Sequence, residues 1–334
     1  MSGSRILVTG GTGSFGNAFV RHALEHLDPG EVVVFSRDEF KQHQMSQEWS
    51  PDRYPIRYFL GDIRDKGRLL RAFNGMDYVV HAAALKHVPA LEQNPFEAVR
   101  TNVLGVQNIV EAALERNVKR VVAISTDKAV SPLNLYGATK LVMEKLLVAA
   151  NTYVRYRDIR FSVVRYGNVV GSRGSVIPLF ADLVARGCCE LPVTDPHMTR
   201  FWITLDQGVD LVIKALLQAH GGETFVPKIP SMSMEDLVAA MPVECTIRVV
   251  GRRPGEKVHE MLISESEGER TVDTGTHYIV YPEFGVDVEA LMPDGAKRVP
   301  PGFTYESDKN SEWVSRAEMQ RLLGEFMNAP GRMT

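Results

Sequence analysis

The fold is decided by the stretch Arg5-Ile6-Leu7-Val8-Thr9-Gly10-Gly11-Thr12-Gly13-Ser14-Phe15-Gly16 near the amino terminus. Its pattern predicts a short β-strand, a glycine-rich turn and an amphipathic helix that continues to about residue 24. Glycines here allow a tight turn and let backbone N–H groups approach a pyrophosphate at the positive end of the helix. The stretch therefore predicts a dinucleotide site, against the alternative of a strand–helix turn without a ligand. The residues expected to contact the dinucleotide are Gly10, Thr12, Gly13, Ser14, Phe15 and Gly16.

Strand-like and helix-like segments alternate from this stretch to about residue 165. Further strands are expected at residues 31–36, 56–60, 78–84, 120–124 and 160–165. This alternation predicts an α/β fold with a Rossmann-type, doubly wound parallel sheet. Later the alternation fails and proline recurs, so we expect a smaller C-terminal α+β lobe that binds substrate. The predicted division is 1–170 and 171–334, with some later segments returning to the first domain.

Composition limits the classes of protein to which the chain can belong. The 334 residues carry a net charge of −3, so no global basic field for nucleic acid is present. Three cysteines, two of them adjacent (Cys188 and Cys189), argue against a disulfide framework and indicate a reducing compartment. Met1-Ser2-Gly3-Ser4 leaves no room for a signal peptide, and no uncharged apolar run approaches the ~20 residues that span a bilayer. We expect a soluble, cytoplasmic protein without a nucleic-acid or membrane partner.

The end of the second predicted strand bears on the choice of dinucleotide. Ser36 and Arg37 stand where an NAD enzyme usually has an acid for the ribose 2′-hydroxyl, and Lys41 follows one turn later. Because Arg pairs bidentately with phosphate, NADP is favoured over NAD, although Asp38 keeps NAD open. Asp38 and Asp62 are equally placed to cap helices. Further cofactor contacts are expected at Asp62, Ile63, Ala82, Ala83 and Ala84.

Two ionisable clusters follow the fifth predicted strand. Residues 125–134 are predicted as a loop and a helix from Leu135, which places Tyr136 and Lys140 on one helix face. Open α/β sheets carry their chemistry at the carboxyl ends of strands, and this position favours catalysis over a loop cap or a solvated charge. The expected catalytic residues are Thr126, Asp127, Lys128, Tyr136 and Lys140, and the last two are also expected to contact the cofactor.

For several other polar residues the sequence allows both a functional and a purely structural role. Lys86 and His87 follow the fourth predicted strand without further ligands at metal spacing, so we expect no metal site and favour a loop or subunit contact there. Asn102 lies in mid-helix, where it either braces a neighbouring loop or is exposed. Four arginines in Gly-, Ser- and Pro-containing loops each have the ordinary alternative of a solvated surface residue, but together they suggest a diphosphate clamp. They are Arg173, Arg200, Arg252 and Arg253.

The order and spacing of the glycine motif and Tyr136-x-x-x-Lys140 resemble the extended short-chain dehydrogenase/reductase family. Finer motifs are similar to those of the inverting UDP-N-acetylglucosamine 4,6-dehydratases, the kind that opens the pseudaminic acid route. Retaining dehydratases carry Asp-Glu where this chain has Asp127-Lys128, and simple 4-epimerases carry neither pair. The motifs concerned lie at residues 125–129, 133–140, 165–169, 171–176, 198–202 and 302–308.

The resemblance implies a mechanism around a tightly bound NADP that is regenerated in each turnover. Tyr136 would act as acid/base at the sugar C4 hydroxyl, with its pKa lowered by Lys140. Lys128, kept neutral by burial and nearby cations, would remove the C5 proton, and a protonated Asp127 would release the 6-hydroxyl as water. Thr126 stands where the family carries Ser or Thr.

The resemblance also implies a substrate, UDP-N-acetylglucosamine, and a homo-oligomer, dimer or hexamer, in which residues 86–94 are the expected contact. Two alternatives stay open. A UDP-sugar 4-epimerase would need Tyr136 but no Asp–Lys pair, and a non-catalytic NADP-sensing protein would need no intact Tyr-x-x-x-Lys. The implied substrate contacts are Lys86, Asn168, Arg173, Ser175, Val176, Thr194, Met198, Arg200, Arg253 and Glu256.

Overall fold

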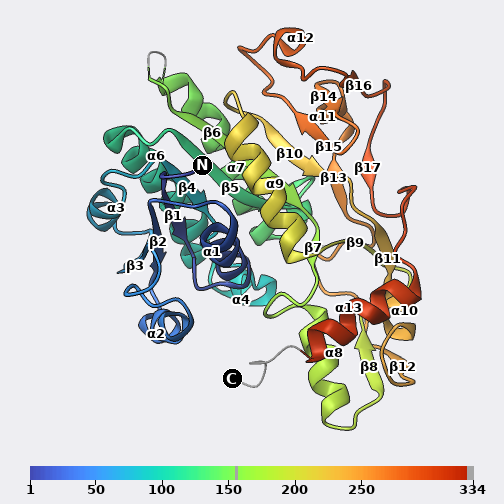
Figure 1. The fold of residues 1–334 in the computed structure, drawn as a ribbon. Helices are drawn as coiled ribbons and strands as arrows, with labels where there is room; N and C mark the ends of the chain where they lie inside the picture. Colours follow the sequence, from blue (N-terminus) through green and yellow to red (C-terminus); the bar gives the residue numbers. More distant parts are fainter. Residues whose placement is uncertain (155–156, 329–334) are drawn as a thin grey trace.

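A computed structural model describes residues 1–154 and 157–328 of the chain. Its larger lobe is built on a ten-stranded sheet (Figure 1). The strands are β1 (Arg5–Thr9), β2 (Glu31–Ser36), β3 (Ile56–Leu60), β4 (Tyr78–His81), β5 (Arg120–Thr126), β6 (Arg160–Tyr166), β10 (Thr224–Pro227), β14 (Thr271–Asp273), β15 (His277–Val280) and β16 (Lys297–Arg298). Their order is β16-β14-β15-β10-β6-β5-β4-β1-β2-β3.

The sheet is parallel from β3 through β10, and the remaining three strands are antiparallel. The four strands β10, β14, β15 and β16 come from the second half of the chain, so that half contributes to both lobes. Parallel crossovers bring the carboxyl ends of β1, β4 and β5 to one edge of the sheet, where ligands bind in folds of this class. The predicted fold class is confirmed.

Helices cover both faces of this sheet (Figure 1). In β1, Ile6 and Val8 pack into one core with α1 and α9, whereas Leu7 packs into the other with α3, α6 and α7. Strands buried on both faces are hydrophobic at successive positions, which explains runs such as Val32-Val33-Val34. The helices are α1 (Ser14–His26), α2 (Glu39–Glu48), α3 (Lys66–Ala72), α6 (Gly105–Arg116), α7 (Leu135–Ala150) and α9 (Leu205–Gln218).

The smaller lobe contains short sheets and helices around a core that includes Phe180, Trp202 and Leu237. Outside the ten-stranded sheet the strands pair in the orders β11-β9-β7, β12-β8 and β13-β17, of which the last packs against the core of the larger lobe. The strands are β7 (Asn168–Val169), β8 (Glu190–Val193), β9 (Thr199–Ile203), β11 (Ser231–Ser233), β12 (Thr246–Val249), β13 (Met261–Ile263) and β17 (Tyr305–Glu306). The helices of the second half, apart from α9, are α8 (Val176–Ala185), α10 (Met234–Ala239), α11 (Glu265–Gly268), α12 (Val288–Leu291) and α13 (Arg316–Asn328).

Three predicted strand ends are wrong: that of the sixth strand by one residue, since β6 ends at Tyr166, and those of the fifth and fourth strands by two and three residues. The fifth strand continues through Thr126 because Ser125 and Thr126 pair with the last two residues of β6. The fourth strand ends at His81, and residues 82–84 leave the sheet towards the glycine-rich turn. The differences at the fifth and fourth strands matter because they decide where the polar side chains beyond each strand lie.

The predicted loop over residues 86–94 contains a short helix, α4 (Val88–Gln93), which is favoured by Pro89 in its first turn. The chain continues as α5 (Pro95–Val99) and a π-helix over Arg100–Leu104. Within residues 1–154 and 157–328, no helix has both the length and the apolar character needed to cross a membrane.

Candidate active site

The turn between β1 and α1 has the shape of a dinucleotide cradle. Gly10 has a φ of +67°, and a Cβ there would lie only 2.8 Å from the backbone N of Ala83. Gly13 precedes α1 and offers no capping side chain, which leaves N–H groups of the first turn available to an anion. The glycines and residues 82–84 therefore lie against one another, and these residues fit a dinucleotide.

Two exposed cations, Arg37 and Lys41, follow β2. Asp38 Oδ1 accepts from the backbone N of Lys41 at 3.0 Å and so caps α2, while its Oδ2 lies 2.9 Å from Lys41 Nζ. Ser36 Oγ is buried and accepts from Gln42 Nε2 at 3.0 Å. The Arg37 side chain is more than half exposed, with Nη1 3.9 Å from Asp62 Oδ2. Asp38 is thus used by its own helix, whereas the Arg37 guanidinium remains accessible.

Asp62 closes a turn rather than capping a helix. Its Oδ1 accepts from the backbone N of Arg64 at 3.0 Å, and its Oδ2 accepts from the Arg64 guanidinium. The cap of α3 is Asp65, which accepts from the backbone N of Arg68 at 2.9 Å. The alternative of a helix cap is therefore wrong for Asp62 and right for Asp38.

The two ionisable clusters after β5 are brought together by close packing. A 3₁₀ turn over Asp127–Ala129 follows β5, and Asn134 caps α7 by accepting from the backbone N of Gly137 at 2.9 Å. A Cβ on Gly137 would collide with the carbonyl oxygen of Lys128. Glycine at this position lets the first turn of α7, which carries Tyr136, pack directly on the 3₁₀ turn.

Asp127 is fully buried at the floor of this site. Its Oδ1 accepts from Thr126 Oγ1 at 2.8 Å and from Lys128 Nζ at 3.0 Å. Its Oδ2 is buried, and none of the residues that the structure describes makes a hydrogen bond to it. Such an atom is costly unless a ligand completes it, so Oδ2 fits a hydroxyl group of a substrate.

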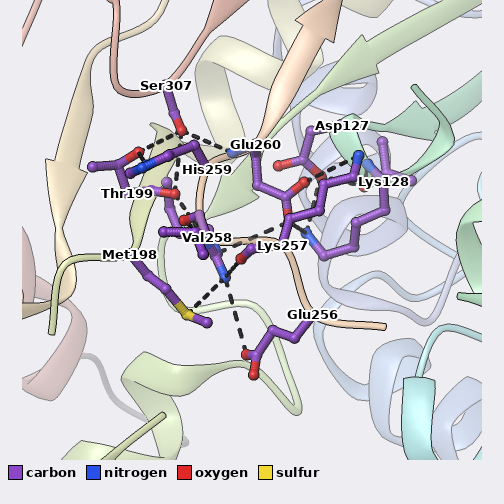
Figure 2. A network of polar contacts seen from close by, with 12 residues as sticks. Asp127, Lys128, Met198, Thr199, Glu256, Lys257, Val258, His259, Glu260 and Ser307 are labelled. Carbon is purple, nitrogen blue, oxygen red and sulfur yellow. Dashed lines mark hydrogen bonds and ion pairs between the residues drawn. The ribbon is translucent and has the colours of Figure 1, made fainter. Parts of the chain in front are cut away.

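Lys128 lies between two carboxylates. Its Nζ is 3.0 Å from Asp127 Oδ1 and 3.4 Å from Glu260 Oε1 (Figure 2). Burial disfavours the ammonium, but the charges of Asp127 and Glu260 outweigh it and raise the pKa of Lys128 above its ordinary value. The expectation of a lowered pKa is therefore wrong, because it did not include the second carboxylate.

Tyr136 and Lys140 lie on one face of α7, as predicted, but they do not affect each other as expected. Burial raises the pKa of Tyr136 to about 12, although Lys128 and Thr126 act in the other direction. Lys140 Nζ donates to the carbonyl oxygen of Ile124 at 2.6 Å, and burial lowers its pKa to about 8. The expected lowering of the Tyr136 pKa by Lys140 is wrong here because the ammonium points to β5.

Two further cations accompany Lys128. One Nη of Arg173 donates to the carbonyl oxygen of Thr12 at 2.8 Å, and its backbone N donates to Ser14 Oγ at 3.2 Å. Lys86 is partly exposed, and burial together with the charges of Arg173 and Lys128 lowers its pKa. The structure thus brings Lys86 and Arg173 towards the 3₁₀ turn Asp127–Ala129, named the catalytic turn here because the sequence predicts catalytic residues in it, and towards the glycine-rich turn, where a diphosphate would be attracted.

The other predicted substrate contacts have different surroundings. Arg200 is buried, and its guanidinium donates to the carbonyl oxygens of residues 199, 257 and 258. Glu256 Oε1 lies 4.0 Å from Arg200, and Glu256 Oε2 accepts from the backbone N of the exposed Arg253. Thr194 Oγ1 contacts Met198 Sδ at 3.2 Å. Asn168 lies in β7, Ser175 precedes α8 and Val176 begins it.

Asn102 braces a loop, which is one of its two predicted roles. It is buried in the π-helix, exchanges two hydrogen bonds of 2.9 Å with the backbone of Leu85, and donates to Thr139 Oγ1 at 3.1 Å. This ties the loop that carries Lys86 to α7. Among the described residues, no group of three or more His, Cys, Asp or Glu side chains is arranged to hold a metal ion.

Sequence reasoning missed Glu260 and Lys257. Lys257 Nζ donates to the carbonyl oxygen of Val130 and lies 3.6 Å from Glu260 Oε2. Lys257 is the last residue of a basic turn predicted at residues 252–257, and Glu260 follows that turn. The turn contacts the start of α7 through the hydrogen bond of Asn134 Nδ2 to the carbonyl oxygen of Gly255 at 2.9 Å. In the sequence, only the three-residue spacing of Lys257 and Glu260 at the end of that turn indicated that these two residues could interact.

Comparisons with known proteins agree with this geometry. A family model described as "Polysaccharide biosynthesis protein" matches residues 6–282. The inverting UDP-N-acetylglucosamine 4,6-dehydratase of Campylobacter jejuni is 47% identical, over 96% of this chain and 98% of that protein. A UDP-glucose 4-epimerase of Rickettsia bellii is 40% identical, over 95% of this chain and 94% of its own length.

Solved structures extend the likeness to the whole chain. Pen from Bacillus thuringiensis superposes with a TM-score of 0.89 at 38% identity, covering 98% of this chain and 99% of that one. The dTDP-glucose 4,6-dehydratase DesIV from Streptomyces venezuelae, solved with NAD bound, gives 0.68 at 26% identity, covering 76% and 86%. The chain therefore belongs to the polysaccharide biosynthesis protein family, in the group of extended short-chain dehydrogenases/reductases that contains the inverting UDP-N-acetylglucosamine 4,6-dehydratases.

Proposed function

We propose that this protein is a UDP-N-acetylglucosamine 4,6-dehydratase that inverts C5 and yields a UDP-2-acetamido-2,6-dideoxy-4-keto-hexose. The observation that carries the proposal is the Asp127–Lys128 pair, joined at 3.0 Å beside Tyr136 at the carboxyl end of β5. Loss of water across C5 and C6 needs a base and an acid in addition to the group that acts at C4. A 4-epimerase needs only the last of these.

The first task of the site is to make C5 acidic. The C5 proton of the substrate becomes acidic when C4 is a ketone, because C5 then lies next to a carbonyl group. When bound, oxidised NADP would accept a hydride from C4 and later return it to C6. Tyr136 takes the proton of the C4 hydroxyl, for which it must first lose its own.

The second task is elimination, for which the Asp127–Lys128 pair must change its charges. The two carboxylates raise the pKa of Lys128 and so favour its ammonium form, whereas the C5 base has to be neutral. The hydrogen bond from Lys128 Nζ to Asp127 Oδ1 is a direct path for that proton. Its transfer leaves a neutral lysine to take the C5 proton and a protonated aspartate to release the 6-hydroxyl as water. Reprotonation from the opposite face would then invert C5.

The proposal includes the finer choices of ligand and assembly. A nicotinamide dinucleotide is the cofactor class of the related DesIV structure. NADP is favoured over NAD because Asp38 caps α2 while Arg37 stays exposed to a 2′-phosphate. The cofactor would remain tightly bound in a cytoplasmic homo-oligomer, dimer or hexamer, with residues 86–94 as the subunit contact. The proposed substrate contacts are those named from the sequence.

A single incubation tests the proposed reaction. The purified protein is mixed with UDP-N-acetylglucosamine without added cofactor, and the product is analysed by mass spectrometry and NMR. We expect the mass to fall by one water, a 4-keto carbon to appear, and C5 to be inverted. A product of unchanged mass with an inverted C4 would contradict dehydration.

That contrary outcome corresponds to the second candidate, a UDP-sugar 4-epimerase. It is favoured by the 40% identity to proteins named UDP-glucose 4-epimerase over nearly the whole chain. Under that function Tyr136 would still be needed. The burial of Asp127, with an Oδ2 that accepts no hydrogen bond from the described residues, would have no role in it.

A further inference from the structure

Glu260 is a buried acid from the second half of the chain that reaches the 3₁₀ turn Asp127–Ala129. It precedes β13, is almost completely buried, and places Oε1 3.4 Å from Lys128 Nζ. Figure 2 shows its side chain extending towards Lys128, with Asp127 beyond. The proposed mechanism assigns it no step.

The backbone of Glu260 is held on the side away from Lys128. Its N–H donates to Ser307 Oγ at 2.9 Å, and its carbonyl oxygen accepts from the backbone N of Ser307 at 2.8 Å. Ser307 is itself buried and shares a hydrogen bond of 2.6 Å with Thr199 Oγ1 of β9 (Figure 2). The carboxylate is therefore presented by fixed backbone, as a preorganised group requires.

The charges around the Lys128 ammonium come from both halves of the chain. Asp127 and Glu260 are its acidic neighbours. Three cations also influence this region, of which Arg200 and Lys257 lie 3.9 Å and 3.6 Å from Glu260. The third is Lys86, and the phenol of Tyr136 is the remaining titratable neighbour. A buried carboxylate among these cations has its negative charge compensated by ion pairs.

We propose that Glu260 is a positioning residue for proton transfer at C5, which holds the Lys128 ammonium against Asp127 from the opposite side. The role in proton transfer at C5 rests on the proposed function. The contact between Glu260 and Lys128 does not depend on that function. Among the described residues, Asp127 accepts the hydrogen bond of Lys128 Nζ at 3.0 Å, whereas Glu260 forms a longer ion pair at 3.4 Å, so the shorter path for the proton leads to Asp127. Glu260 keeps that proton on Lys128 and keeps Nζ in place until substrate enters.

Titration of Lys128 in the free protein tests this role. Protein labelled with ¹³C at lysine Cε is followed by NMR, and the Lys128 signal is assigned by its loss in Lys128→Met. We expect the wild-type midpoint above the ordinary lysine value of about 10.4, and a fall of about 1 to 3 pH units in Glu260→Gln. Glu260→Asp, which keeps the charge, should recover most of this fall. An unchanged midpoint in Glu260→Gln overturns the proposal.

A matched control separates the contact from the loss of any buried acid. Glu223 is equally buried but accepts from the backbone N–H groups of His220 and Gly221. Glu223→Gln should leave the Lys128 midpoint unchanged, and an equal fall in this variant overturns the assignment. If Glu260→Gln does not fold, the wild-type titration decides, because a midpoint at or below the ordinary lysine value overturns the proposal.

Kinetics supply the second readout. In Glu260→Gln the pH at which C5 deuterium exchange is half-maximal should fall with the Lys128 midpoint, while KM for UDP-N-acetylglucosamine stays within about threefold. A raised KM with an unchanged pH profile would identify a merely structural residue and overturn the proposal. If the wild-type protein removes no water from this substrate, the proposed function fails, whereas the NMR titration still decides the role of Glu260.

Discussion

The Lys128 ammonium and the Asp127 carboxylate meet at 3.0 Å (Nζ to Oδ1) although the two residues are neighbours in the chain. Neighbouring side chains of a strand point to opposite faces, so this contact exists because β5 ends at Thr126 and a 3₁₀ turn follows. An acid and a base that share a hydrogen bond can exchange a proton without a water molecule. The end of β5 thus sets up the pair before any ligand binds.

Replacing Lys128 by Ala should stop proton transfer at C5. With the base removed, we expect deuterium incorporation at C5 in deuterated water to fall by about 10²-fold or more, because general bases contribute about 10² to 10⁴. Lys145→Ala, on the exposed side of the same helix α7, should retain wild-type incorporation. Undiminished incorporation in Lys128→Ala would exclude Lys128 as the C5 base.

Oxidation at C4 should become faster as the pH rises. Burial raises the pKa of Tyr136 to about 12, so the tyrosinate is scarce at neutral pH and increases towards alkaline pH. We expect the single-turnover rate of nicotinamide reduction to rise between about pH 7 and pH 10, and Tyr136→Phe to abolish reduction. A rate that is independent of pH over this range would show that Tyr136 is not deprotonated in that step.

His81 should make the protein less stable in mild acid. It is buried against Thr9 Oγ1 at 2.7 Å, and burial, with Lys140 nearby, lowers its pKa to about 3. The unfolded state therefore binds the proton first, so stability falls as the pH drops below the unfolded pKa of about 6.5 and continues to fall towards pH 3. Between pH 7 and pH 5 this histidine should account for about 2 kcal/mol of the unfolding free energy.

Urea unfolding at these two pH values measures the effect. The pH-dependent loss should shrink by about that amount in His81→Asn relative to wild type. The exposed His43→Asn should show the same loss as wild type. Equal losses in all three proteins would mean that His81 is not the group that titrates.

Arg37 should discriminate between the two dinucleotides. It is an accessible cation that directly follows β2, whereas Asp38 is used as a helix cap. Arg37→Ala should weaken NADP binding to apoprotein about 10-fold, as expected for loss of a charge-assisted hydrogen bond to phosphate, and should leave NAD binding nearly unchanged. Arg53→Ala, an exposed arginine elsewhere, is the control in the same fluorescence titration. Equal weakening for both dinucleotides would contradict a 2′-phosphate contact.

The parts of the site that were predictable are those encoded locally. The glycine-rich turn and the pair Tyr136 and Lys140 each depend on spacing within a few residues. The structure places the turn between β1 and α1, and the pair on one face of α7, as expected. The register of β5 with β6 was not visible, because pairing across strands carried Ser125 and Thr126 into the sheet.

The electrostatics were not predictable for a different reason. The charge state of Lys128 depends on Glu260, which lies far along the chain in a segment without a regular pattern. Likewise, Lys140 is drawn to a backbone carbonyl of β5 that no side-chain motif reports. A pKa is set by all neighbours in space, whereas a motif reports only those in sequence.

The hydrogen bond from Arg173 to the carbonyl oxygen of Thr12 has a consequence for the lifetime of the bound cofactor. It fastens a loop beside the smaller lobe onto the turn that would cradle the dinucleotide. Departure of a bound dinucleotide would thereby be linked to release of this hydrogen bond, an event that the proposed reaction, with its internal hydride cycle, would not require. Such a catalyst can keep one cofactor molecule through many rounds, and its output then no longer follows the cellular ratio of oxidised to reduced dinucleotide.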